Sequence, residues 1–233
     1  MSLPSLGAAY RALVIGASGA IGSAFVEALQ ADAQCAHVVP LSRRTHPGFE
    51  LGNEASIAAA AVSVSASGPY ALMIDATGAL VIDGHGPEKR LSELSAERLL
   101  AQFTVNAMGP ALLLKHFMPH LAPGRAIYAK LSARVGSISD NQRGGWYGYR
   151  SAKAALNMLL QTAAIECAVR QPQAVIAALQ PGTVASPLSA PFTRGTATLT
   201  PAESVAGMLA VLDTLQPTRG AQFRDYRGAL VPW

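Results

Sequence analysis

The chain alternates between short apolar runs and longer stretches in which apolar residues recur at helical spacing. The short runs are typical of buried parallel strands, and the six candidates, of which the last is the weakest, are Ala12–Ile15, His37–Leu41, Tyr70–Asp75, Arg125–Leu131, Val175–Gln180 and Ala221–Tyr226. The longer stretches predict helices over about Ala20–Asp32, Glu54–Ser65, Ala96–Leu121, Tyr149–Arg170 and Pro201–Leu215. This alternation predicts an α/β fold in which helices cover both faces of a doubly wound parallel sheet. With 233 residues and no repeat or low-complexity linker, a single domain is expected.

A glycine-rich turn, Gly16–Gly22 (GASGAIG), joins the first predicted strand to the first predicted helix. Glycines at such a turn let backbone N–H groups approach a phosphate, and the N-terminus of the following helix adds partial positive charge. A tight turn that merely contains glycine is the alternative, but strand, turn and helix in this order favour nucleotide binding. The turn therefore indicates a Rossmann-type sheet.

Three further segments follow predicted strands at the same edge of the sheet. They are Asp75–Gly78, Leu131–Ser132 and Gln180–Thr183. Because ligands of open parallel sheets bind beyond the carboxyl ends of the strands, we expect these segments and the glycine turn to converge on one cleft.

Tyr149 and Lys153 stand four residues apart in a predicted helix, so both side chains project from one helical face. A phenol has an ordinary pKa of about 10, and a neighbouring ammonium favours the phenolate and lowers that pKa. The pair is therefore a candidate acid/base device. Tyr147 is a competing phenol, but Ser151 rather than a lysine stands four residues after it.

The composition excludes several classes of protein. Half of the residues are hydrophobic and 14% are charged, which excludes a disordered chain. The net charge is +4, but the basic residues are scattered, and the only adjacent pairs are Arg43-Arg44 and Lys89-Arg90. No basic stripe for nucleic acid is present. A local site for an anionic cofactor explains Arg43-Arg44 better.

Neither a metal site nor a membrane segment is expected. The two cysteines, Cys35 and Cys167, belong to no metal-spaced cluster and are expected to be buried thiols. His116 and His120 are four residues apart, but a proline intervenes and no glutamate completes a metalloprotease pattern. The N-terminus lacks the pattern of a signal peptide, and no apolar stretch reaches spanning length. These features predict a cytoplasmic protein.

The predicted helix Tyr149–Arg170 is apolar over much of its circumference. One face would cover the sheet, and the remaining apolar surface would be exposed to solvent unless another subunit covered it. We therefore expect a homodimer or homotetramer that uses this helix and the stretch Ala96–Leu121.

Taken together, these elements resemble the short-chain dehydrogenase/reductase family over essentially the whole chain, and the C-factor-like reductases within it. The matching segments are Gly16–Gly22, Asn106–Gly109, Gly144–Lys153, Pro181–Thr183 and the C-terminal FRDYRGALVPW. The resemblance implies a single NAD(P)-binding domain over residues 1–233. It also implies an oxidoreductase that moves a hydride between nicotinamide and a carbonyl or alcohol substrate.

The resemblance assigns catalytic roles by position. Tyr149 would exchange a proton with the substrate oxygen, and Lys153 would lower the pKa of Tyr149 and hold the nicotinamide ribose. Asn106 would hold a water that links Lys153 to solvent, because an amide donates and accepts at once. A satisfied polar group inside a helix is the alternative for Asn106.

The catalytic serine of the family has no direct counterpart, because counting back from Gly136 puts Ala133 in its place. Ser132 is adjacent, but consecutive side chains of a strand face opposite ways. Either the strand end shifts so that Ser132 serves, or Ser137 or Ser139 substitutes, or no hydroxyl does. We keep Ser132 as the candidate.

The resemblance also implies a set of cofactor-binding residues. Besides Tyr149 and Lys153 these are Gly16, Ser18, Ala20, Ile21, Arg43, Arg44, Leu51, Ala76, Thr77, Gly78, Pro181, Gly182, Thr183 and Val184. The segment after the second strand contains Arg43 and Arg44 and no acid, and guanidinium groups suit a 2′-phosphate. NADP is therefore favoured over NAD.

The sequence leaves two functions open. An NADP-dependent oxidoreductase is favoured by Tyr149, Lys153 and Asn106, whereas Ala133 favours an NADP(H)-binding sensor with little turnover. The loop from Ala185 to Thr200 is expected to cover the cleft, and its Leu188, Phe192 and Leu199 favour an apolar small-molecule substrate.

Overall fold

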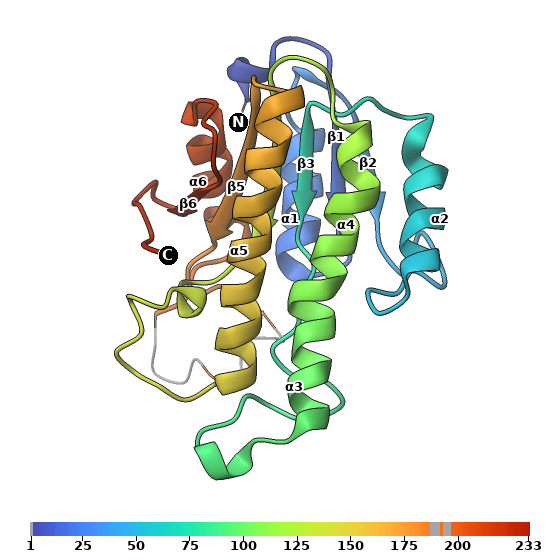
Figure 1. Ribbon diagram of the computed structural model, residues 1–233. Helices are drawn as coiled ribbons and strands as arrows, with labels where there is room; N and C mark the ends of the chain where they lie inside the picture. The colour runs from blue at the N-terminus through green and yellow to red at the C-terminus, as the bar shows by residue number, and fades with distance from the viewer. Residues whose placement is uncertain (1, 187–191, 193–196) are drawn as a thin grey trace.

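The computed structural model describes residues 2–186, 192 and 197–233, and this part of the chain contains a six-stranded sheet in the order β2-β1-β3-β4-β5-β6 (Figure 1). The strands are β1 (Tyr10–Ile15), β2 (Cys35–Leu41), β3 (Leu72–Asp75), β4 (Ala126–Leu131), β5 (Ala174–Gln180) and β6 (Gln222–Asp225). Every neighbouring pair is parallel. The strand order reverses direction between β1 and β3, which is the switch point where sheets of this kind bind ligands.

Helices cover both faces of the sheet, as predicted. They are α1 (Ala20–Gln30), α2 (Glu54–Ser65), α3 (Ala96–Phe103), α4 (Gly109–Phe117), α5 (Tyr147–Arg170) and α6 (Pro201–Thr214). Shorter helical segments are η1 (Pro4–Leu6), η2 (Leu91–Glu93), the π-helical η3 (Thr104–Met108), η4 (Met118–His120) and η5 (Arg134–Gly136). Helices α2, α4 and α5 pack on one face, and α1 and α6 pack on the other (Figure 1).

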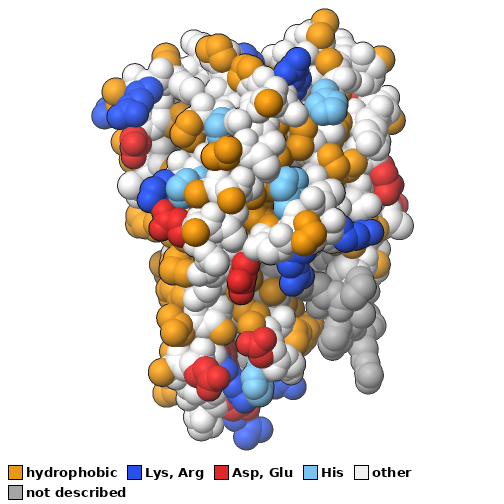
Figure 2. Space-filling model, turned by 90° about the vertical axis from the view of Figure 1, so that its right-hand side faces the viewer, with side chains coloured by type: hydrophobic (Ala, Val, Ile, Leu, Met, Phe, Trp, Pro, Cys, Tyr) orange, Lys and Arg blue, Asp and Glu red, His pale blue; other side chains and the backbone are white. Residues whose placement is uncertain are grey.

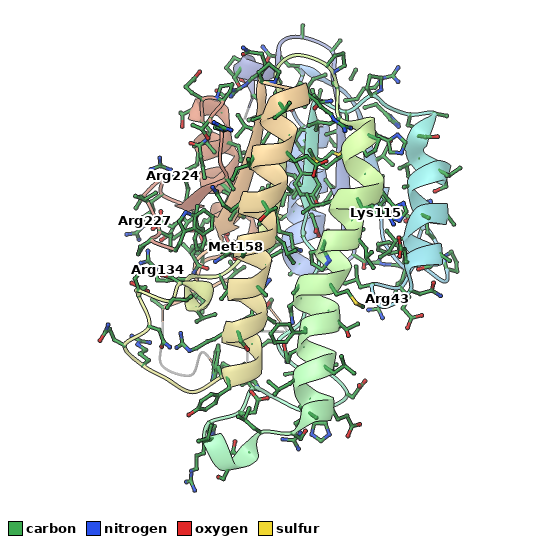
Figure 3. All side chains as sticks on the ribbon, in the orientation of Figure 1. Arg43, Lys115, Arg134, Met158, Arg224 and Arg227 are labelled. Carbon is green, nitrogen blue, oxygen red and sulfur yellow. The ribbon has the colours of Figure 1, made fainter. Side chains whose placement is uncertain are left out.

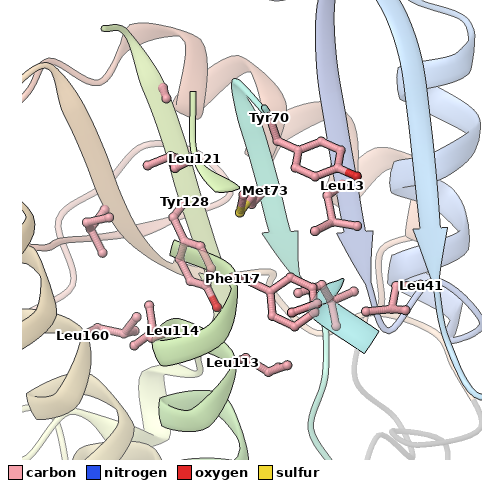
Figure 4. Packing of buried hydrophobic residues seen from close by; sticks show 14 of the residues in the cluster. Leu13, Leu41, Tyr70, Met73, Leu113, Leu114, Phe117, Leu121, Tyr128 and Leu160 are labelled. Atoms are coloured by element: carbon pink, nitrogen blue, oxygen red, sulfur yellow. The ribbon is translucent and has the colours of Figure 1, made fainter. Parts of the chain in front are cut away.

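The core consists of two apolar layers, one on each side of the sheet. On the α4–α5 side, Phe117 and Leu160 reach down onto Met73 and Tyr128 of the central strands (Figure 4). On the other side, Phe25 of α1 belongs to the second buried cluster. The near-continuous burial of β1, β3, β4 and β5 explains why these strands stand out in the sequence as apolar runs.

The predicted helical stretch Ala96–Leu121 is helical from Ala96 to His120, but it is not one regular α-helix. It is divided into α3, the π-helical turn η3, α4 and the short turn η4. In a π-helical turn each backbone hydrogen bond spans one residue more than in an α-helix. The extra residue changes the direction in which the following side chains point. Asn106 lies in the middle of this turn.

The surface carries no dominant charge of one sign on the face that Figure 2 presents, where basic and acidic side chains are interspersed. Within the described residues, no helix is both long and apolar enough to cross a membrane.

Candidate active site

The glycine turn lies between β1 and α1 at the carboxyl edge of the sheet. Gly16 has φ +82°, which favours glycine, and a Cβ on Gly22 would collide with the Gly16 carbonyl. Gly19 caps α1 without a side-chain hydrogen bond. The first N–H groups of α1 are therefore not occupied by a side-chain cap, and they are available to an anionic ligand.

Two arginines follow β2 beside this turn. The backbone N–H groups of Gly16 and Ala17 both donate to the Leu41 carbonyl, which joins the glycine turn to the end of β2. The Arg44 guanidinium donates to the Ser18 carbonyl at 3.3 Å. Arg43 is exposed on the same loop (Figure 3). The Arg44 guanidinium thus lies next to the open N-terminus of α1, and Arg43 precedes it in the chain.

A second turn, residues 75–79 after β3, packs directly against the glycine turn. A Cβ on Gly16 would come within 3.0 Å of the backbone of Ala76 and Thr77, so the two turns touch. Gly78 has φ +139°, and a Cβ there would lie 3.1 Å from Asn106 Oδ1 and 3.4 Å from Lys153 Nζ. The turn therefore links the glycine turn to Lys153.

Asn106 is fully buried and holds the same turn from the side of η3. Its Oδ1 accepts a hydrogen bond from the Ala79 N–H at 3.1 Å, and its Nδ2 donates to the Ala79 carbonyl at 2.8 Å. Nδ2 also donates to Gln102 Oε1 at 2.8 Å. In this structure the amide fixes the turn through direct bonds.

Tyr149 and Lys153 lie in the first two turns of α5, with Lys153 Nζ 5.7 Å from the centre of the Tyr149 ring. The Lys153 ammonium donates to the Leu131 carbonyl at 3.2 Å. Burial, followed by the charge of Lys130, lowers the pKa of Lys153 to about 7. Burial raises the pKa of Tyr149 to about 12, opposite to the direction expected from the sequence. Burial is the cause of the raised pKa of Tyr149, while the Lys153 ammonium is bonded to the Leu131 carbonyl.

The hydroxyls near Ala133 have other partners. Ser132 is buried, and its Oγ donates to Asn157 Oδ1 of α5 at 2.6 Å. Ser137 Oγ accepts from the Asp140 N–H at 3.1 Å. Ser139 Oγ donates to the Trp233 carbonyl at 2.8 Å. The catalytic assignment of Ser132 therefore stays a prediction, with its hydroxyl engaged within the fold.

The remaining candidate cofactor residues line the same edge. Pro181, whose carbonyl accepts from Ser204 Oγ at 2.6 Å, begins the segment after β5. Val184 is buried and bridges to Leu199. Leu51 packs against Gly109 at the start of α4, where a Cβ would come within 2.8 Å of the Leu51 Cβ. These contacts fix the backbone around the edge without a bound ligand.

An aromatic group stands beside Tyr149. The Trp146 ring contacts Tyr149 edge-to-face, with ring centres 6.2 Å apart, and contacts Phe192 with centres 5.5 Å apart. Trp146 has φ +55°, a left-handed conformation at the residue before α5. Leu188, another of the three apolar residues singled out in this loop, lies outside the described residues.

Two buried charged groups near the site were not singled out as site residues in the sequence. Lys130 of β4 pairs with Asp75 at 2.9 Å, and both side chains are fully buried. Glu88 Oε2 accepts from the Gly148 N–H at the N-terminus of α5 at 3.0 Å. A lysine within the apolar run AIYAKL was the visible signal for the first, whereas nothing local marks Glu88.

The comparisons with known proteins agree with this geometry. A profile of the family described as short chain dehydrogenase matches residues 10–196. The chain is 37% identical over 145 residues to the C-signal of Myxococcus xanthus, covering 61% of this chain and 83% of that protein. It is 28% identical over 191 residues to the 1-hydroxy-2-glutathionyl-2-methyl-3-butene dehydrogenase of Rhodococcus sp. (strain AD45), covering 80% and 79%.

Solved structures show the same fold. The NADPH-bound carbonyl reductase from chicken fatty liver superposes with a TM-score of 0.81 at 26% identity, covering 97% of this chain and 100% of that chain. The carbonyl reductase Sniffer of D. melanogaster, at 19% identity, has a TM-score of 0.80 and the same coverage of 97% and 100%. The parallel sheet and the glycine turn at its switch point are those of a dinucleotide-binding oxidoreductase. The chain belongs to the short-chain dehydrogenase family.

Proposed function

We propose that this chain is an NADP(H)-dependent reductase or dehydrogenase for a carbonyl/alcohol pair, with Tyr149 as its proton donor and acceptor. The observation that carries the proposal is a continuous set of contacts. The glycine turn touches the turn 75–79, Gly78 of that turn faces Lys153 Nζ, and Lys153 lies beside the Tyr149 ring. A dinucleotide-type turn and a phenol–ammonium pair are therefore joined through the turn 75–79.

The residues present fit such a cofactor. A side chain at Gly22 would fill the space of the turn, and α1 begins with backbone N–H groups that have no side-chain cap. Arg43 and Arg44 would hold a 2′-phosphate, and this supports NADP over NAD. When bound, NADPH would supply the hydride.

Within this site, the phenol of Tyr149 suits proton donation. Because burial raises its pKa to about 12, Tyr149 stays protonated at neutral pH in the cofactor-free protein. It can then give its proton to a substrate oxygen as negative charge develops there. Lys153 would hold ribose hydroxyls, and Trp146 and Phe192 would exclude water from an apolar substrate.

The test follows NADPH absorbance with a panel of aldehydes, ketones and quinones. Tyr149→Phe removes only the hydroxyl, so we expect turnover to fall by about 10²–10⁴-fold while NADPH binding persists. Tyr147→Phe is the matched control, because it deletes an exposed phenol two residues earlier on the same helix. Equal activity of Tyr149→Phe and Tyr147→Phe contradicts the proposed role.

A second function is supported by one observation. Ala133 stands where the family places a serine, and the neighbouring Ser132 hydroxyl is bound to Asn157. Loss of one hydrogen bond to the reacting oxygen would slow turnover by about 10²–10³-fold. Tight NADPH binding with no turnover across the panel would favour an NADP(H)-binding sensor.

Cofactor choice has its own test. We expect Arg43→Ala and Arg44→Ala to raise the NADPH dissociation constant about 10–100-fold, the value of one charge-assisted hydrogen bond. The NADH constant should change little, because NADH lacks the 2′-phosphate. Arg219→Ala is the control, since this exposed arginine precedes β6 at the opposite edge of the sheet. Isothermal titration of both cofactors decides, and equal weakening of NADH and NADPH rejects the assignment.

A further inference from the structure

A buried ion pair lies directly behind the candidate active site. Asp75 is the last residue of β3, and Lys130 is its partner in the register of the neighbouring strand β4. Lys130 Nζ and Asp75 Oδ1 are 2.9 Å apart, and neither side chain is exposed. Removing two charges from water is costly, and a buried pair is weak evidence of a contribution to stability. The pair therefore needs another explanation.

The ion pair is part of a closed network that fixes the turn after β3. Lys130 Nζ also donates to the Thr77 carbonyl at 2.7 Å and contacts Thr77 Oγ1 at 3.0 Å. Asp75 Oδ1 accepts from the Thr77 N–H at 2.9 Å and from Thr77 Oγ1 at 2.6 Å. Lys130 thus holds the turn from inside the sheet, while Asn106 holds Ala79 from the other side.

This network lies against Lys153. Lys153 donates to the carbonyl of Leu131, the residue that follows Lys130, and Gly78 of the fixed turn faces Lys153 Nζ. The charges that act on Lys153 are those of Lys130 from β4 and Asp75 from β3, and the Tyr149 ring of α5 lies 5.7 Å from its Nζ. The π-helical turn contributes Asn106, which is uncharged. Lys130 Nζ bonds the Thr77 carbonyl, and Lys153 Nζ lies beside Gly78, so the two ammonium groups flank consecutive residues of one turn.

We propose that Lys130 is a positioning residue for Lys153: its ammonium, fixed by Asp75 and Thr77, sets where the Lys153 ammonium rests and repels the charge on it. A neutral amide at position 130 could close much of the same hydrogen-bond network at a smaller desolvation cost. A cation at this position balances the buried Asp75 carboxylate and also places a like charge near Lys153. The effect on turnover rests on the proposed function, whereas the effect on the protonation of Lys153 is measurable without cofactor.

The chain offers a direct measurement, because it contains four lysines: Lys89, Lys115, Lys130 and Lys153. The ¹³C signals of the lysine ε-carbons are followed by NMR as the cofactor-free protein is titrated. The exposed Lys89 and Lys115 serve as reference signals. In Lys130→Gln we expect the Lys153 midpoint to move upward, because the repelling charge is gone and Asp75 remains.

Because Lys130→Gln leaves the buried Asp75 carboxylate without its cation, a second variant removes both charges. Asp75→Asn/Lys130→Gln leaves the site neutral, and we expect a smaller upward shift, since Lys130 has the larger of the two opposing effects on Lys153. Tyr128→Phe is the control. It alters a buried uncharged group whose hydroxyl lies 3.5 Å from Asp75, and the Lys153 midpoint should not move.

The outcomes separate this inference from the proposed function. A Lys153 midpoint that stays unchanged or falls in the folded variants overturns the inference. An upward shift in a protein without turnover on any carbonyl supports the inference and leaves the proposed function refuted. In an active protein, the pH profile of kcat/KM of Lys130→Gln should move in the same upward direction, and a loss of rate with no movement of the profile contradicts the role.

Discussion

At the scale of single residues, Lys153 imposes a cost on the fold. The side chain is 3% exposed, and burial together with Lys130 lowers the pKa of Lys153 from 10.5 to about 7. Between these two values the unfolded chain binds a proton that the folded chain does not. The free energy of unfolding therefore rises with pH from about 7 to 10.5 because of this group, and the full cost is present below pH 7.

This cost predicts that Lys153→Met stabilises the cofactor-free protein. Each kcal/mol regained should raise the melting temperature by about 2–4 °C, and we expect the rise to be largest at pH 6–7 and to shrink toward pH 10. Scanning calorimetry of both proteins across this range measures the difference. A difference that is constant with pH, or that grows toward pH 10, contradicts the assignment.

The hydroxyl and amide groups of the site show which features the sequence could not predict. The sequence named Ser132 and Asn106 as site candidates, and both are buried at the expected edge. Their hydrogen-bond partners could not be predicted, because Asn157 and Ala79 are brought to them only by the packing of α5 and of the turn after β3. Residue type and place followed from local pattern, whereas partners followed from the tertiary fold.

At the scale of elements, α5 depends on a distant cap. The helix begins after Trp146, which has a left-handed backbone and gives no side-chain cap. The buried Glu88 replaces that cap: its carboxylate accepts from the Gly148 N–H, and its carbonyl accepts from the Trp146 N–H. The carboxylate also opposes the positive end of the helix dipole. Tyr149 lies in this first turn, so Glu88 fixes the backbone that bears the phenol.

We expect Glu88→Gln to destabilise the protein by about 0.5–2 kcal/mol, the value of a helix cap. It should also lower kcat more than it changes KM, because the first turn of α5 loosens. Glu93→Gln is the matched control, since Glu93 is an exposed carboxylate on the same loop. Chemical unfolding and steady-state kinetics of the two variants test this role of Glu88. Indistinguishable results for the two variants would contradict it.

The strands and most helices follow from apolar periodicity to within two or three residues, because a buried parallel sheet needs continuous apolar runs. The stretch Ala96–Leu121 agrees in its bounds but is not one regular α-helix. Its π-helical turn around Asn106 does not disturb the apolar pattern enough to be visible. Only one partner of the Asp75–Lys130 ion pair could be suspected from the sequence. Lys130 stands out in an apolar run, but Asp75 lies 55 positions earlier and is brought beside it only by the strand order.

At the scale of the whole molecule, the outer face of α4 and α5 exposes several large apolar side chains. Met158, Ile165 and Val169 share one face of α5 and are 67%, 41% and 79% exposed. Met158 is labelled on that helix in Figure 3. A groove of about 590 Å³ runs between α4 and α5 and includes Leu114, Met118 and Leu159. An apolar face of this kind is typical of a subunit contact.

We therefore expect a homodimer or homotetramer that buries this face. Val169→Lys should shift the protein toward monomer, because the contact would have to bury a charge. Val62→Lys is the matched control, with the same substitution at a valine of α2 that is 72% exposed. Light scattering after size-exclusion chromatography at micromolar concentration measures the mass. A monodisperse wild-type monomer contradicts the expectation.

The proposed function requires the phenol, its lysine neighbour and the nicotinamide to lie together at one site. A crystal structure of the protein with bound NADP⁺ tests it most directly. We expect the pyrophosphate at the N-terminus of α1, ribose hydroxyls within hydrogen-bond reach of Lys153 Nζ, and Tyr149 Oη facing the space over the nicotinamide C4. A Tyr149 oxygen turned outward to solvent, or a nicotinamide bound away from α5, would contradict it.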